Sequence, residues 1–232
     1  SPDLVASIQL AEKARDDMER LAARTGAAVD VVAAVGSDLV FVGAATGVDV
    51  APSVPTLGTR IPLIAPLGEQ YVAWAGEAAA ESWIRRAGAS DPEVADGLRR
   101  RLMLARERGW SMSRLDPEDE LDFYQTLRDY TDGELVPAKE RALRDRIVQW
   151  SQHYEPVQID PTALYSAHSL VVPVLGKDNR PLLNIRLVNL PRPATGEQVL
   201  EWVLDLRRCA ASVASRLTED PRSQRLGHGT ST

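Results

Sequence analysis

The chain has 232 residues, of which 44% are hydrophobic and 26% are charged, as in ordinary globular domains. Its length is enough for one substantial domain or two small ones. The formal net charge of −6 argues against a protein that holds a nucleic-acid backbone by itself. The one cysteine, Cys209, excludes an internal disulfide and any Cys-x-x-Cys metal or redox site.

Targeting, membrane and metal signals are missing from the sequence. No apolar run approaches the ~18 residues of a membrane span, and no N-terminal stretch has the layout of a signal peptide. We therefore expect a cytoplasmic protein without a membrane partner. The three histidines, His153, His168 and His228, are scattered, so we predict neither a zinc site nor a cofactor.

The first third of the chain predicts a helix and a β-hairpin. Apolar residues recur at helical spacing over residues 3–25, and Gly26 follows as a helix end. Two β-rich runs, 27–35 and 39–45, are separated by the short turn "GSD". Residues 46–58 contain prolines and glycines and are predicted to form a loop.

The stretch "TRIPLIAPLGEQYVAW" predicts a short strand that stops abruptly before a helix. The strand covers 60–64, and the helix continues to about residue 86. Pro62 and Pro66 lack backbone N–H groups, so this strand cannot lie in the middle of a sheet. Gly68 would allow the backbone to approach a ligand closely where a Cβ would obstruct it. The N–H groups of the following helix start would suit an anion or a hydroxyl.

Three helices and a strand are predicted in the middle of the chain. Ser90 and Glu93 have the spacing of a capping box before a helix that Gly109 ends. Asp116 and Pro117 mark a second helix start by similar means. The ranges are a helix at 90–108, a strand at 110–114, a helix from 116 and a helix at 137–152.

The last third predicts strands and a closing helix. The strand ranges are 155–159, 168–175 and 182–190, and "GKDNRP" joins the last two as a hairpin. Thr195 and Gln198 form a capping box for the final helix. Residues 219–232 are polar and are predicted to be a flexible tail.

This order of elements predicts an α+β fold, with a mostly antiparallel sheet flanked by helices. Strand pairs joined by short turns are typical of antiparallel sheets, and helices can cover their faces. We find no internal repeat, and we expect one domain over 1–218.

Alternation in the strand 182–190 separates two faces. Leu183, Ile185 and Leu187 point one way, whereas Asn184 and Arg186 point the other way, into either solvent or a cavity. An arginine lining a cavity could bind a carboxylate through both of its terminal nitrogens. The alternative is a surface salt bridge from Arg186 to an acidic neighbour.

Several motifs together resemble one protein family. They are "LAEKARDDMERLAARTG" before the hairpin, "RIPLIAPLGEQYVAWAG", "ARERGWSMSRLDPEDE" and "SLVVPVLGKDNRPLLNIRLVNLP". In this order they resemble the effector-binding domain of IclR-family transcriptional regulators, which has a GAF-like fold. Two departures are Glu69, where the family usually has lysine after the glycine, and 116–160, which looks like an insertion.

The resemblance implies a ligand-sensing domain that binds a small organic acid or an aromatic metabolite. It implies a homodimer or tetramer, with residues 1–25 as a linker and dimerisation helix. It further implies that DNA is bound only through a winged helix-turn-helix ahead of residue 1. The family's small-molecule site maps to Leu67, Gly68, Tyr71, Ser169, Asn184 and Arg186.

The sequence favours a sensor over an enzyme. Gly-x-Ser-x-Gly, P-loop and His-Glu-x-x-His signatures do not occur in it. Ser166, His168 and Ser169 are neighbours in sequence, but a catalytic triad is a spatial arrangement, so we assign no catalytic residue. A stand-alone GAF-like sensor with an output other than DNA binding remains the alternative.

Overall fold

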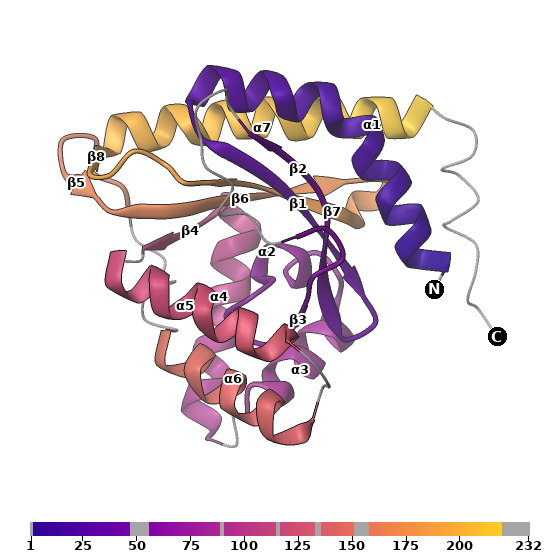
Figure 1. The fold of residues 1–232 in the computed structure, drawn as a ribbon, viewed down its shortest axis with the longest axis vertical. Coiled ribbons are helices and arrows are strands. Elements are labelled where there is room, and N and C mark those ends of the chain that lie inside the picture. Colours follow the sequence, from indigo (N-terminus) through magenta and orange to yellow (C-terminus); the bar gives the residue numbers. More distant parts are fainter. Residues whose placement is uncertain are drawn as a thin grey trace.

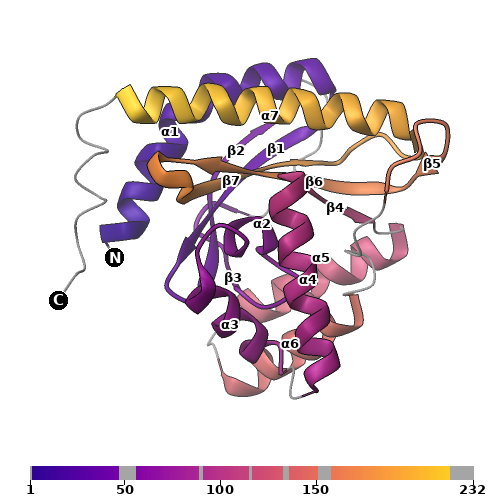
Figure 2. The same cartoon turned by 180° about the vertical axis from the view of Figure 1, so that it is seen from behind.

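A computed structural model describes residues 2–46, 56–88, 91–114, 117–132, 136–150 and 158–219. Two long helices, α1 (Pro2–Thr25) and α7 (Gly196–Glu219), lie side by side over one face of a curved sheet. The remaining helices cover the opposite face (Figures 1 and 2). The chain ends therefore contribute one layer, and the middle of the chain contributes the other.

The sheet has six strands, and every neighbouring pair is antiparallel. Its order is β3-β2-β1-β7-β6-β4. The strands are β1 (Ala28–Val35), β2 (Asp38–Thr46), β3 (Arg60–Pro62), β4 (Ser111–Arg114), β6 (Ala167–Leu175) and β7 (Pro181–Val188). The predicted α+β class with an antiparallel sheet is confirmed. Pro62 lies on the edge strand, where its missing N–H breaks no ladder hydrogen bond.

Side-chain alternation along the strands divides the interior into two hydrophobic cores. Val29 and Val31 of β1 pack beneath α1 and α7, whereas Val32 packs against the helices of the other face. Strand β7 follows the same rule, because Leu183 and Ile185 belong to the α1/α7 core. Asn184 and Arg186 therefore face the opposite layer.

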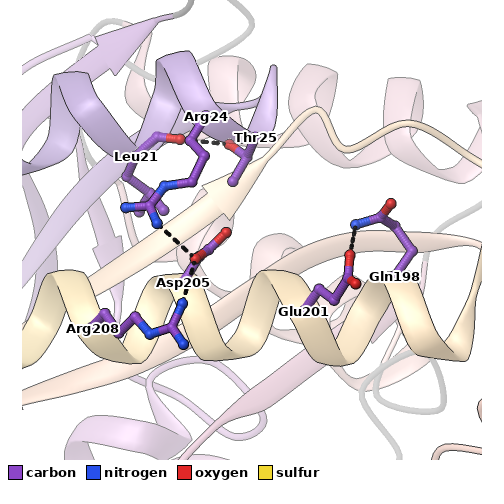
Figure 3. Close-up of polar contacts among 7 residues, drawn as sticks. All are labelled: Leu21, Arg24, Thr25, Gln198, Glu201, Asp205 and Arg208. Carbon is purple, nitrogen blue, oxygen red and sulfur yellow. Dashed lines mark hydrogen bonds and ion pairs between the residues drawn. The ribbon is translucent and has the colours of Figure 1, made fainter.

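Polar contacts join the two long helices at the end of α1 (Figure 3). Arg24 donates to Asp205 of α7 at 3.1 Å, and Arg208 donates to the same carboxylate at 3.4 Å. Thr25 donates to the Leu21 carbonyl at 2.8 Å and so closes the last turn of α1. The three charged side chains are exposed or near the surface, so their contribution to stability is small.

Five helices form the layer described on the other face of the sheet. Its helices are α2 (Glu69–Val72), α3 (Glu77–Arg86), α4 (Pro92–Arg108), α5 (Pro117–Thr131) and α6 (Pro137–Trp150). Trp83 of α3 and Leu143 and Ile147 of α6 are among its fully buried side chains. Helices α5 and α6, which lie within the predicted insertion, thus complete this core.

Two predictions about helix boundaries need correction. The single helix expected to reach residue 86 is broken into α2 and α3, because Gly76 between them has φ 94°. Helix α4 is capped by Asp91, whose side chain accepts from the Glu93 N–H at 2.9 Å. Ser90 and Asp116, the predicted caps, lie outside the described residues.

The strand predicted at 155–159 is wrong where the structure describes it. Residues 158–160 are not in a strand, and 155–157 lie outside the described residues. A two-residue strand, β5 (Leu164–Tyr165), instead pairs with β8 (Ala194–Thr195). The capping box of α7 is half formed: the Gln198 N–H donates to Thr195 Oγ1, but the Gln198 side chain donates to Glu201.

Two other predicted segments extend beyond the described residues. Strand β2 runs to Thr46, and 47–55 of the expected loop lie outside the described residues. Helix α7 includes Glu219, so the first residue of the tail predicted over 219–232 is helical, and 220–232 lie outside the described residues. Within the described ranges, no helix is long and apolar enough to cross a membrane.

Candidate functional site

A cavity of about 60 Å³ lies between the helical face of the sheet and the junction from β3 to α2. Its apolar wall comes from β1, β2, β3, β4, β6, α5 and the junction itself. Its polar wall comes from β4, β6, β7 and α2. The lining residues are Val32, Leu39, Phe41, Ile61, Pro66, Leu67, Gly68, Glu69, Gln70, Ser111, Met112, Ser113, Leu127, Ser169, Val171, Asn184 and Arg186.

The register between β4 and β6 brings two hydroxyl groups of this wall together. Ser113 of β4 stands directly opposite Ser169 of β6, and their Oγ atoms are 2.6 Å apart. Ser113 Oγ is also 3.1 Å from Nδ1 of His168. All three side chains are buried, so the chain of hydrogen bonds fixes where the hydroxyls stand. His168 is therefore a strand residue that supports the wall.

The junction is held by a tryptophan of the next helix. Trp83 Nε1 donates to the Leu67 carbonyl at 2.8 Å, and both residues are buried. The Ala65–Pro66 peptide bond is cis, and Gly68 has φ 76°. The chain thus turns from β3 into α2 with Leu67 and Gly68 against the cavity.

Gln70 of α2 carries an amide group into the cavity wall. Its Nε2 donates to the Ala105 carbonyl at 3.0 Å and to Ser111 Oγ at 2.9 Å. A carbonyl can only accept, so the contact with Ala105 fixes which end of the amide is the nitrogen. The remaining Oε1 is buried and has no hydrogen-bond partner among the described residues.

Arg186 is held in an ion pair inside the protein. Its Nε and Nη2 donate to Asp30 Oδ1 and Oδ2 at 2.8 and 3.0 Å. The two residues stand opposite each other on β7 and β1, so the sheet register itself makes the pair. Burial raises the pKa of Asp30, while the charge and hydrogen bonds of Arg186 oppose that rise. The surface salt bridge considered for Arg186 is therefore replaced by a pair with a fully buried carboxylate.

Glu69 is compensated by a second buried pair. Arg101 of α4 donates from Nε to Glu69 Oε2, and both side chains are almost fully buried. The acidic residue at this junction is therefore neutralised from the neighbouring helix. Arg101 belongs to a basic stretch of sequence, and no periodic signal separates it from the exposed arginines beside it.

Five of the six predicted site residues line the cavity, namely Leu67, Gly68, Ser169, Asn184 and Arg186. Tyr71 does not line it; it packs at the edge of the second core, where burial raises the pKa of its phenol. Helix α2 has only four residues, so it offers the cavity little of the helix-end charge expected there. Sequence reasoning did not single out the other lining residues, among them Gln70, Ser111, Ser113 and Leu127.

Gly68 serves a different purpose from the predicted one. A Cβ at this position would lie 2.3 Å from Cδ1 of Leu63, a core side chain, rather than in the path of a ligand. The left-handed φ adds a second reason for glycine. We predict that Gly68→Ala lowers the free energy of unfolding by about 1–2 kcal/mol.

Urea unfolding followed by tryptophan fluorescence would measure this loss. Gly97→Ala is the matched control, because only the end of the Arg100 side chain, 3.9 Å away, approaches a Cβ there. Gly97 lies within α4, so alanine is expected to leave stability equal or higher. Equal stability of Gly68→Ala and the parent protein would contradict the prediction.

Metal chemistry finds no support in the described part of the chain. Over those residues, no group of three or more histidine, cysteine or acidic side chains could hold an ion. The site instead combines an apolar wall with amide and hydroxyl groups, as small-molecule pockets commonly do.

Comparison with solved structures finds the same fold in transcriptional regulators. The chain is 18% identical to an IclR transcriptional regulator from Alicyclobacillus acidocaldarius, with a TM-score of 0.58, covering 89% of this chain and 67% of that one. It is 16% identical to an IclR homologue from Microbacterium hydrocarbonoxydans solved with 4-hydroxybenzoate, with a TM-score of 0.55, covering 90% and 68%. For the C-terminal domain of KdgR from E. coli the values are 14%, 0.53, 89% and 96%.

The family assignment rests on the sequence. A search of curated proteins gave no match. The family model of the bacterial transcriptional regulator IclR C-terminal domain matches residues 3–122, more than half of the chain. The chain therefore belongs to the IclR family of transcriptional regulators, in the part that forms their C-terminal domain.

Proposed function

We propose that this regulatory domain binds a small organic effector in the cavity between the sheet and the β3–α2 junction. The observation that carries the proposal is a pair of buried amide oxygens on two residues that line the cavity. Gln70 Oε1 and Asn184 Oδ1 have no hydrogen-bond partner among the described residues. A buried polar atom without a partner is costly, so such atoms often mark a ligand site.

The proposed effector is a small organic acid or an aromatic metabolite. The apolar wall, with Phe41, Leu39 and Leu127, suits the body of such a molecule. The Microbacterium relative was solved with 4-hydroxybenzoate, which combines both classes. The five lining residues that the sequence pointed to are proposed contacts, and Gln70 and Ser113 join them.

Binding is proposed to control a DNA-binding domain that precedes residue 1. An effector shifts an equilibrium only if it binds one arrangement of the subunits better than the other. We infer that α1 lies at a subunit contact of a dimer or tetramer, since Val5 and Ile8 near its start are exposed. A strictly monomeric species in sedimentation at tens of micromolar would contradict this arrangement.

The DNA partner requires that further domain. With a net charge of −6, residues 1–232 alone are not expected to bind duplex DNA at physiological salt. A gel-shift or fluorescence titration with DNA duplexes of mixed sequence would test this. Salt-resistant, sequence-specific binding by these residues would overturn the assignment.

The effector proposal is tested by filling the cavity. Ser169→Leu and Val171→Phe each add apolar volume to a wall residue, and Ser215→Leu adds the same volume on the exposed face of α7. A library of small acids, alcohols, phenols and amides would be screened against all four proteins by ligand-observed NMR. Compounds should bind the parent and Ser215→Leu, and binding should be lost in the filled variants that retain the parent circular dichroism. Undiminished binding by both filled variants would place the site elsewhere.

A further inference from the structure

One polar group of the residues that line the cavity, the Gln70 side-chain amide, is fixed so that its oxygen remains a hydrogen-bond acceptor. Gln70 is almost completely buried, and its Nε2 is committed to the Ala105 carbonyl and to Ser111 Oγ. Rotating the amide would set two carbonyl oxygens against each other. Gln70 therefore presents only Oε1, which needs an O–H or N–H group from its occupant.

A second acceptor belongs to Asn184, which also lines the cavity. Asn184 is buried, and its Oδ1 has no hydrogen-bond partner in the described part of the chain. Its position on β7 is opposite Val32 of β1 and Pro173 of β6, so the backbone under it is fixed from both sides. The two amides approach the cavity from different elements, and each leaves an oxygen unsatisfied.

The positive charges near the cavity are already balanced. Arg186 binds both oxygens of Asp30, and Arg101 binds Glu69. A carboxylate entering the cavity would have to compete with Asp30 for Arg186, while its own oxygens faced the acceptor Gln70. Burying a carboxylate without an available cation is strongly unfavourable.

Resting on the effector function above, we propose that the cavity selects an uncharged, compact molecule carrying O–H or N–H donors, such as an alcohol, a phenol or an amide. Its donors bind Gln70 Oε1 and Asn184 Oδ1. Its apolar body lies against Phe41 and Leu39. The cavity of about 60 Å³ holds only a few heavy atoms as it stands, so a ring requires the wall to widen.

Two isosteric pairs of probes test this selection: acetamide against acetate, and benzamide against benzoate. Each pair has the same shape but differs in charge and in N–H donors. At neutral pH, calorimetry or NMR titration of residues 1–232 should give the amide at least about tenfold tighter binding than its acid, the scale of one hydrogen bond.

Variants then assign the preference to the amide side chains. Asn184→Leu and Gln70→Met keep similar volume and remove the acceptors, and each should weaken amide binding by about tenfold. Gln125→Met, at an exposed position of α5, is the control and should bind as the parent does. If Gln70→Met fails to fold because the Ala105 carbonyl loses its hydrogen-bond donor, Asn184→Leu still tests the selection.

The outcomes separate the ligand class from the effector function. Tighter binding of amides that the acceptor variants lose supports the selection. Equal or tighter binding of the acids, abolished by Ser169→Leu, overturns the selection and leaves the effector function standing. No binding of any of the four probes at millimolar concentration overturns both.

Discussion

Asp30→Ala is expected to destabilise the domain by about 3–5 kcal/mol. Asp30 is fully buried on β1 and accepts two hydrogen bonds from Arg186 on β7. Arg186 is only 17% exposed and lies 5.3 Å from the ring centroid of Phe41. Removing the carboxylate leaves a guanidinium ion in a largely apolar setting, which costs more than the pair itself contributes.

Urea unfolding of the variant and the parent would measure the loss. Asp205→Ala is the matched control: its carboxylate also accepts two hydrogen bonds from arginine side chains, but they come from Arg24 and Arg208, which are both more than half exposed. The control should lose about 1 kcal/mol or less. The double variant Asp30→Leu/Arg186→Met replaces both charges with apolar groups and should recover most of the stability. A loss below that of Asp205→Ala would contradict the buried pair.

Trp83→Ala is expected to cost about 3–5 kcal/mol as well. Trp83 is one of the largest fully buried side chains, and it packs among the residues of the second core. It also donates to the Leu67 carbonyl, beside the cavity. The substitution thus opens a void and removes the contact that fixes the junction.

Trp83→Phe separates the two effects. It keeps most of the ring volume and removes the hydrogen bond, leaving the buried Leu67 carbonyl without its donor, at a cost of about 1–3 kcal/mol. Both variants should also weaken binding of any cavity ligand, because Leu67 and Gly68 line the cavity. Full stability of Trp83→Ala in urea unfolding, or unchanged ligand affinity in both variants, would contradict this role.

The regular elements could be predicted because their periodicity is strong. Alternation in β1, β2 and β7 identified which side chains share a face. The structure confirms that Leu183 and Ile185 lie on one face of the sheet and Asn184 on the other. The apolar stripe of α7 was equally clear. Short elements were missed, since the two-residue strands β5 and β8 carry no pattern to detect.

Strand alternation and the family motif together identified five of the lining residues, namely Leu67, Gly68, Ser169, Asn184 and Arg186. The partners that balance the charges of Arg186 and Glu69 could not be predicted, because Asp30 and Arg101 lie far from them in sequence. Asp30 had a usable signal, as the only charge in an otherwise apolar strand, and its parity places it on the Val32 face. Gln70 had none, since its bond to the Ala105 carbonyl spans 35 residues of sequence.

The predicted insertion also contributes to the site. Leu127 of α5 lines the cavity, and Leu143 and Ile147 of α6 are buried in the core beneath it. Helix α5 therefore forms part of the cavity wall, and α6 packs in the core behind it. Their sequence shows helices but not which face meets the cavity.

Backbone amide NMR of residues 1–232, titrated with the tightest-binding compound of the screen, would locate the effector site. We expect the largest chemical-shift changes at Gln70, Ser113, Ser169 and Asn184. We expect little change along the groove between α7 and β6 that Trp74, Pro173 and Arg207 line. Changes concentrated in that groove, with the four cavity residues unaffected, would contradict an effector site in the cavity.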